Sequence, residues 1–365
     1  MKPTLRCLTG LLGLVAGGQA PVALATDNAC EWLGGGSGIM TFTQRMEDIY
    51  VPRDAPVGSV INNLFFKRTP NAEGRSIVCS KSDNTVTLKF DAQSSVPPLQ
   101  DTFHGNKAYG STSALLPTNI PGIAAQFRLG FPFNGSATNS FVSDFGSSIV
   151  PFSASHRGTM GASNLNFALL ESYITLIKTG PIAAGKQTFN GQELFSGTFA
   201  GIPGKAFRFG LDGDVYVAHC GSSTVSVTPV PLGEWNQSEF TGPSYTTTAV
   251  PFSINLKSCI ADDKNQYNAY ANIYFEGAGG SVPVTPAIPG VFTLNSASDA
   301  KGVGIQILME NQSTPIALNT EVPIKQITSG ETELKFAARY YQVDASRDIV
   351  AGEAKGTLNF TITYK

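Results

Sequence analysis

Residues 352–365 read GEAKGTLNFTITYK, and their polarity alternates. Leu358, Phe360, Ile362 and Tyr364 each stand next to polar residues. Because successive side chains of a β-strand point to opposite faces, the alternation predicts a strand with one apolar and one polar face. On alternation alone, the expected setting is an ordinary strand inside a closed sandwich.

Further strand-like runs recur along the chain, most of them near Gly, Pro, Asn or Ser clusters. They lie at residues 85–90, 125–129, 173–178, 253–256, 269–275, 304–309 and 333–342. No stretch of three or more turns keeps a 3.6-residue apolar period, so helices should be few and short. The chain is also too long for one small sandwich, so the expected fold class is all-β, with two tandem β-sandwiches.

The boundary between the two sandwiches is expected near Cys220. Residues 207–209 and 215–217 read as short strands around a turn at 211–214, and a new strand begins at 224–227. The expected segments are a signal peptide at 1–25, an N-terminal domain at 26–217, a linker at 218–223 and a C-terminal domain at 220–365.

The first 25 residues have the composition of a secretory signal peptide. Lys2 and Arg6 precede an apolar run at residues 8–16, and Ala23-Leu24-Ala25 offers an A-x-A cleavage site. The apolar run is shorter than the roughly 20 residues that a membrane-spanning helix needs. Cleavage after Ala25 is therefore expected, rather than retention as an anchor.

The cysteines indicate an oxidising compartment. Cys7 would leave with the signal peptide, and the remaining four form an even set. Four cysteines allow three connectivities, but only the pairs Cys30–Cys79 and Cys220–Cys259 close loops within separate halves. A metal site is the weaker alternative, because no Cys-x-x-Cys occurs and the three histidines lie far apart. We expect no metal and no cofactor.

Charge argues against nucleic acid as a partner. The chain has 25 Lys and Arg against 27 Asp and Glu, with no basic stripe. A hydrolase would need placed carboxylates, and Asp212 and Asp214 would share a face if they lay on a strand. Gly213 between them favours a turn instead. No G-x-S-x-G motif occurs, so no enzymatic activity is expected.

Several segments between residues 220 and 365 resemble the pilin domain of chaperone-usher fimbrial subunits. Gly352 is fourteenth from the end and Tyr364 is penultimate, which is the spacing of that family's C-terminal β-zipper strand. VPFSINL at 250–256, running into Cys259, and AKGVGIQ at 300–306 are also similar.

The resemblance implies an incomplete immunoglobulin-like sandwich that lacks one strand, leaving an apolar groove and an unpaired sheet edge. A periplasmic chaperone would first insert a strand there, and at the outer-membrane usher the next fimbrial subunit would replace it by β-strand addition. The carboxylate of Lys365 would be held by the chaperone. The binding strand implied by the family comprises Gly352, Leu358, Phe360, Ile362, Tyr364 and Lys365.

About 190 residues with their own cysteine pair precede the pilin-like region, which resembles a two-domain fimbrial tip adhesin. Segments 116–123 and 176–181 are similar to such adhesins in outline. The resemblance implies an exported protein at the fimbrial tip on the cell surface, which binds a host or surface glycan or protein. The alternatives are a structural minor pilin or tip adaptor without its own receptor, and a secreted hydrolase with an accessory domain.

Candidate receptor-binding residues lie near the first cysteine pair. Asp83 and Asn84 could hydrogen-bond ligand hydroxyls, and Trp32 could provide an apolar platform. The alternative is a surface turn and a core residue. Asn190 and Gln192 offer polar groups in a second loop. The mannose-specific type 1 adhesin has an N-terminal aromatic residue and an Asn-Asp pair after its second cysteine, and neither is present here, so mannose specificity is not expected.

Overall fold

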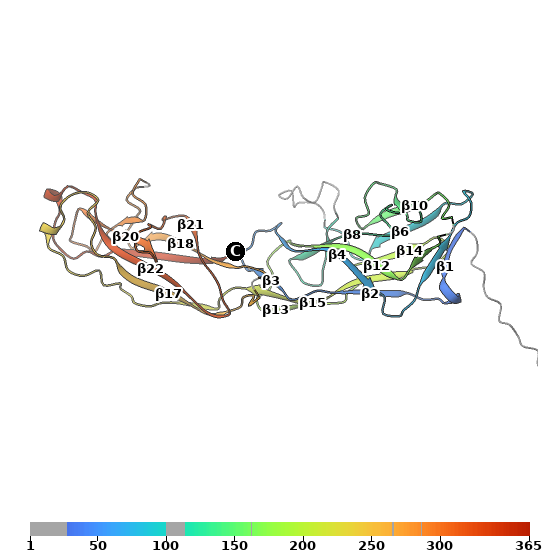
Figure 1. Ribbon diagram of the computed structural model, residues 1–365. Coiled ribbons are helices and arrows are strands. Elements are labelled where there is room, and N and C mark those ends of the chain that lie inside the picture. Colours follow the sequence, from blue (N-terminus) through green and yellow to red (C-terminus); the bar gives the residue numbers. More distant parts are fainter. Residues whose placement is uncertain (1–27, 100–113, 162, 265, 286) are drawn as a thin grey trace, which may run out of the picture.

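The computed structural model describes residues 28–99, 114–161, 163–264, 266–285 and 287–365. Within these residues the regular structure is β, with short 3-10 helices at η1 (Leu33–Gly35), η3 (Gln237–Glu239) and η4 (Ser346–Asp348). None of the helices described is long and apolar enough to cross a membrane. The chain forms two β-sandwiches in tandem (Figure 1), as predicted. The expected signal peptide at 1–25 lies outside the described residues.

The N-terminal sandwich is built from a large sheet, a facing sheet and a small sheet at one end. The large sheet runs in the order β13 (Lys186–Asn190), β15 (Phe207–Ala218), β14 (Phe195–Phe199), β6 (Leu88–Ser94), β10 (Phe152–His156), β9 (Val142–Ser143), with β2 (Met40–Arg45) and β3 (Ile49–Pro52) parallel to β15. The facing sheet is β4 (Val60–Pro70), β12 (Leu169–Lys178), β8 (Ile123–Leu129), β7 (Leu116–Pro117). The small sheet is β1 (Ala29–Trp32), β5 (Ile77–Ser80), β11 (Leu165–Phe167).

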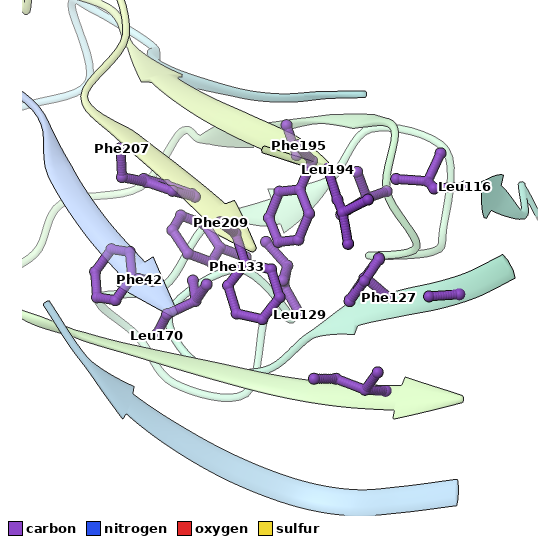
Figure 2. Close-up of a cluster of buried hydrophobic side chains, with 14 of the residues drawn as sticks. Phe42, Leu116, Phe127, Leu129, Phe133, Leu170, Leu194, Phe195, Phe207 and Phe209 are labelled. Atoms are coloured by element: carbon purple, nitrogen blue, oxygen red, sulfur yellow. The ribbon is translucent and has the colours of Figure 1, made fainter. Parts of the chain in front are cut away.

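Phenylalanines fill the space between these sheets (Figure 2). The ring of Phe127, on the facing sheet, lies 5.2 Å from Phe195 and 5.4 Å from Phe209, on the large sheet. Gly197 leaves room for the ring of Phe207, since a Cβ there would lie 2.1 Å from a ring carbon. Burial of these large apolar surfaces is the main force that holds the sheets together.

The C-terminal sandwich packs two sheets around a separate core cluster. One sheet is β16 (Ser222–Val225), β17 (Val250–Cys259), β22 (Gly330–Gln342), β20 (Val303–Met309), β19 (Val291–Thr293). The other is β21 (Glu321–Gln326), β18 (Tyr270–Ala278), β23 (Thr357–Tyr364). Phe275 and Phe336 meet edge to face at 5.7 Å and join the two sheets. Both expected disulfides form, Cys30–Cys79 across β1 and β5 and Cys220–Cys259 in this sandwich.

The two sandwiches meet through the residues that follow β15. His219 and Gly221 donate backbone hydrogen bonds to Ile260 and Lys257, so the segment between β15 and β16 is tied to the C-terminal sandwich. The Asn62 Nδ2 donates to the Tyr267 hydroxyl at 2.6 Å from the other side of the junction. The domain and linker bounds stay a prediction, since no comparison tests them.

The turn predicted at residues 211–214 is wrong. β15 runs without interruption from Phe207 to Ala218 and changes partners on both edges. Gly213 instead allows the backbone of Met46 to come close to β15, because a Cβ at position 213 would lie 2.7 Å from the Met46 carbonyl oxygen. The strand predicted at 85–90 begins only at Leu88.

Candidate functional site

The free edge of β23 is the first candidate site. β23 pairs antiparallel with β18, from Ala271 opposite Tyr364 to Ala278 opposite Thr357. Among the residues that the structure describes, no strand pairs with its other edge. The side chains follow the predicted alternation from residue 357 to residue 362, with exposed Asn359 and Thr361 between three half-buried apolar residues, Leu358, Phe360 and Ile362.

Backbone groups of alternate β23 residues point to this free edge. Lys365 and Tyr270 exchange both of their backbone hydrogen bonds, at 3.1 and 2.7 Å, so residue 365 faces β18. Successive residues of a strand direct their N–H and C=O groups to opposite sides. The groups that face away from β18 are therefore those of Leu358, Phe360, Ile362 and Tyr364.

An apolar groove of about 360 Å³ opens beside the free edge. It is lined from both sheets and from the segment after β16, by Val225, Val230, Phe252, Tyr340, Leu358 and Phe360 among others. A second hollow of about 870 Å³ shares Val230, Leu232 and residues 354–357 with it. The groove is therefore continuous with a depression beyond the beginning of β23.

Gly352 and Gly356 bring the chain close to its neighbours before β23 begins. A Cβ on Gly352 would lie 2.7 Å from the Asp299 Cβ, and one on Gly356 would lie 2.6 Å from the Phe292 ring. Gly352 also lines the second hollow. The structure therefore places the predicted glycine at a close backbone contact beside the groove.

Tyr364 lies at the junction with the N-terminal sandwich and is 4% exposed. Its N–H donates to Asp54 Oδ2 at 2.8 Å, and its carbonyl accepts from the Asp54 N–H at 2.9 Å. The Arg53 guanidinium lies 4.9 Å from its ring centroid. Burial is the main cause of the raised pKa of the Tyr364 hydroxyl. Sequence reasoning missed Asp54, which closes the end of the free edge.

The Lys365 side chain reaches across β18 to β21, in the same sheet. Its Nζ forms an ion pair with Glu321, which also accepts from the Thr363 hydroxyl. These hydrogen bonds from Lys365 and Thr363 lower the pKa of Glu321. The predicted contact of the Lys365 carboxylate with a chaperone stays a prediction.

Asp83 belongs to a hydrogen-bonded turn after β5. Its Oδ1 accepts from the Thr85 N–H at 2.8 Å, and its Oδ2 accepts from Asn28 Nδ2 at 3.2 Å. The hydrogen bonds from Thr85 are the main cause of the lowered pKa of Asp83. Asn84 is exposed in the same turn. The Asp83 carboxylate accepts hydrogen bonds from Thr85 and Asn28, next to it in the structure, which favours the surface-turn interpretation.

The other predicted receptor residues lie apart from this turn. Trp32 is half-buried against the N-terminal core. Asn190 stands opposite Asp212 on the large sheet, and its Oδ1 accepts from the Gln192 N–H at 3.1 Å. No interaction between described residues joins Gln192 or Asn190 to the Asp83 turn. The structure thus does not gather the predicted residues into one site.

A row of aromatic and arginine side chains lies at the surface of the facing sheet, with Tyr173 half-buried among exposed residues. The Tyr173 ring lies 4.0 Å from the Arg128 guanidinium and 5.7 Å from the Phe66 ring. Arg68 lies over Phe66 and pairs with Glu171 at 2.8 Å. Aromatic residues and arginine are enriched at interaction surfaces.

Asp212 and Asp214 do lie on one strand, contrary to the predicted turn, yet each has its own basic partner. Arg45 lies 3.6 Å from Asp212, and Lys186 lies 2.8 Å from Asp214. Hydrogen bonds from Lys186 and Thr188 lower the pKa of Asp214. A general acid of a glycosidase needs a raised pKa, so Asp214 does not have the chemistry of that role. The described residues contain no cluster of three or more metal-ligating side chains.

An open strand edge beside an apolar groove, in a sandwich with its own disulfide, is the arrangement of a fimbrial pilin domain. Residues 210–365 match the Fimbrial protein family. The chain belongs to this family, and the resemblance to chaperone-usher fimbrial proteins is confirmed.

The relatives include both subunits and an adhesin. The fimbrial subunit type 1 of Salmonella typhimurium is 32% identical over 158 residues, which cover 42% of this chain and 80% of that protein. A fimbria adhesin protein of Klebsiella pneumoniae is 28% identical over 94% of this chain and 97% of its own length. The CupB6 tip adhesin of Pseudomonas aeruginosa has a TM-score of 0.36 at 15% identity, covering 92% and 94% of the two chains.

Proposed function

We propose that this protein is a fimbrial tip adhesin that accepts a strand through its C-terminal sandwich and binds a surface glycan through its N-terminal sandwich. The observation that carries the proposal is the free edge of β23 beside an apolar groove. An unpaired edge is a template for another chain, and natural proteins rarely leave one open without a partner.

The incoming strand would lie along β23. Main-chain hydrogen bonds would form with Leu358, Phe360 and Ile362, whose backbone groups face the free edge, and alternate side chains would fill the groove. A periplasmic chaperone would supply this strand first. At the usher, the next subunit would supply its replacement.

The N-terminal sandwich would bind the receptor. Similarity to the Klebsiella pneumoniae adhesin over nearly the whole chain supports this role. A minor pilin or tip adaptor, in which this sandwich is only a spacer, is the second candidate. It is supported by the subunits among the relatives, which match only part of the chain.

The strand-acceptor role is tested by periplasmic co-expression with and without the cognate chaperone. Wild type should be recovered only as a one-to-one complex, and Phe360→Asp should lose the chaperone because it places a charge in the groove. Thr361→Asp, on the exposed face of the same strand, is the matched control and should keep it. A wild-type chain that is a stable monomer indifferent to the chaperone would refute the proposal.

The receptor role is tested on fimbriated cells. Deletion of residues 28–217 should abolish adherence to a glycan-coated surface while fibres persist. Unchanged adherence would favour the tip adaptor.

A further inference from the structure

A polar hollow of about 400 Å³ lies in the N-terminal sandwich between residues 137–144 and 155–158. Its two sides are joined by the pairing of β9 with β10, where Ala154 stands opposite Ser143. β10 lies toward the end of the N-terminal sandwich that points away from the C-terminal sandwich (Figure 1). The volume is within the range of small-molecule sites, about 300–1,000 Å³.

Asp144 places a carboxylate at this hollow. Its Oδ1 accepts from the Ser155 hydroxyl at 2.6 Å, and Lys89 Nζ donates to its Oδ2 at 3.2 Å. Arg157 lies 3.7 Å away and is 76% exposed, so its other N–H groups are free to turn to a ligand. The hydrogen bond from Ser155 is the main cause of the lowered pKa of Asp144. About two of its roughly four acceptor positions are used, which leaves room for ligand hydroxyls.

His156 lines the same wall of the hollow. Its Nδ1 lies 2.8 Å from the Ser140 carbonyl oxygen, which accepts the ring proton that Nδ1 carries. This hydrogen bond joins residue 140, on one side of the hollow, to β10 on the other. The Nε2 atom is fully buried and does not face the hollow.

An exposed apolar side chain lies beside the polar groups. Val142 lines the hollow and is 58% exposed. An apolar side chain beside polar groups suits a ligand with one apolar and one polar side.

The walls are held in place before any ligand arrives. Phe141 is fully buried and anchors one wall, and the Ser143 hydroxyl donates to the Ser147 carbonyl at 2.5 Å. The buried Lys81 donates to the carbonyls of Arg157 and Asp83, which joins the second wall to the turn after β5. Fixed walls reduce the entropy that binding must overcome.

We propose that this hollow is the receptor site and that its ligand is a neutral sugar. Ring hydroxyls would donate to Asp144 and accept from Arg157, and the apolar face of the pyranose would lie on Val142. A cationic ligand is disfavoured, because Asp144 already has two basic neighbours. This inference rests on the proposed adhesin function.

The test uses the full chain purified from the periplasm and an array of immobilised neutral and sialylated oligosaccharides. Val142→Ala and Arg157→Gln change exposed side chains, so they should fold normally and weaken binding at least tenfold. Leu33→Ala and Arg45→Gln, equally exposed residues elsewhere on this sandwich, are the matched controls and should bind as wild type does.

Three results would overturn the inference in distinguishable ways. Wild-type binding that survives both hollow variants would move the receptor site elsewhere and leave the adhesin function standing. Retention of sialylated probes alone would refute a neutral ligand. A wild type that binds no oligosaccharide would refute the glycan receptor itself, together with the site.

Discussion

Asp54 occupies the last position on the free edge of β23, and its replacement should loosen that end of the strand. In Asp54→Ala the Tyr364 N–H loses its acceptor at 2.8 Å. Hydrogen bonds to charged groups contribute about 1.5–3 kcal/mol. The Asp54 side chain is 30% exposed, so solvent screening should reduce this. We expect a loss of about 1.4 kcal/mol, which is tenfold in an equilibrium constant.

Amide hydrogen exchange measures this loss at one residue. The Tyr364 amide should exchange about tenfold faster in Asp54→Ala, if local opening controls its exchange. The Lys365 amide, which donates to Tyr270, serves as an internal reference and should change less. Asp54→Asn keeps an acceptor oxygen, so its Tyr364 amide should exchange at a rate between those of wild type and Asp54→Ala. Asp348→Ala, an exposed acidic residue of η4, is the control for loss of a surface charge.

Unchanged protection of Tyr364 in Asp54→Ala would refute the reasoning, because the amide would then have another source of protection. A uniform rise in exchange over all of β23 would also contradict it. That result would mean that Asp54 stabilises the whole sandwich rather than one end of an edge.

Further predictions follow from the cores and the hollow. Gly197→Ala should destabilise the fold by about 1–3 kcal/mol in urea unfolding, because its Cβ would overlap the Phe207 ring. Gly36→Ala should be near neutral, because its Cβ would lie 3.9 Å from the Leu33 carbonyl oxygen, an ordinary contact. Equal midpoints for the two variants would contradict the packing argument. Cys220→Ser should cost about 2–5 kcal/mol by the same measurement, and an unchanged midpoint would show that the disulfide is dispensable. The pKa of Asp144 is lower in the folded protein than the value near 3.9 of an unfolded chain. Ionised Asp144 therefore stabilises the fold above the unfolded pKa, and this contribution is lost only as the pH falls through the lower folded pKa. Asp144 should therefore cause no change in sugar binding from pH 7 to pH 5, and a midpoint within that range would show that another group controls binding.

The sequence predicted β23 well because its signal is local. Alternation over residues 357–364 reports which side chains face the core, and the structure reproduces that pattern. β15 was predicted as two strands because Asp212 and Gly213 favour turns in isolation. What overrides this preference is distant in sequence, since Gly213 admits the Met46 carbonyl of another segment.

The sites show the same limit. Asp54 and Tyr364 are separated by 310 residues, and the Lys89–Asp144 pair is separated by 55. No sequence motif contains both residues of either pair, so spacing along the chain could not predict these contacts. The one local signal for the hollow is an acidic residue, Asp144, in a loop rich in serine and glycine. That signal is too common to single out without the fold.

The position of Asp54 also bears on how an incoming strand would align with β23. Asp54 bonds both backbone groups of Tyr364, as a paired strand residue would, whereas those of Leu358, Phe360 and Ile362 have no strand partner among the described residues. From residue 358 to residue 362 a strand rises by about 14 Å, which is room for roughly five paired residues. At the other end the groove continues past Thr357 into the second hollow. An incoming strand can therefore extend beyond the beginning of β23 but not beyond its end, so the N-terminal sandwich would fix the register of the strand that the C-terminal sandwich accepts.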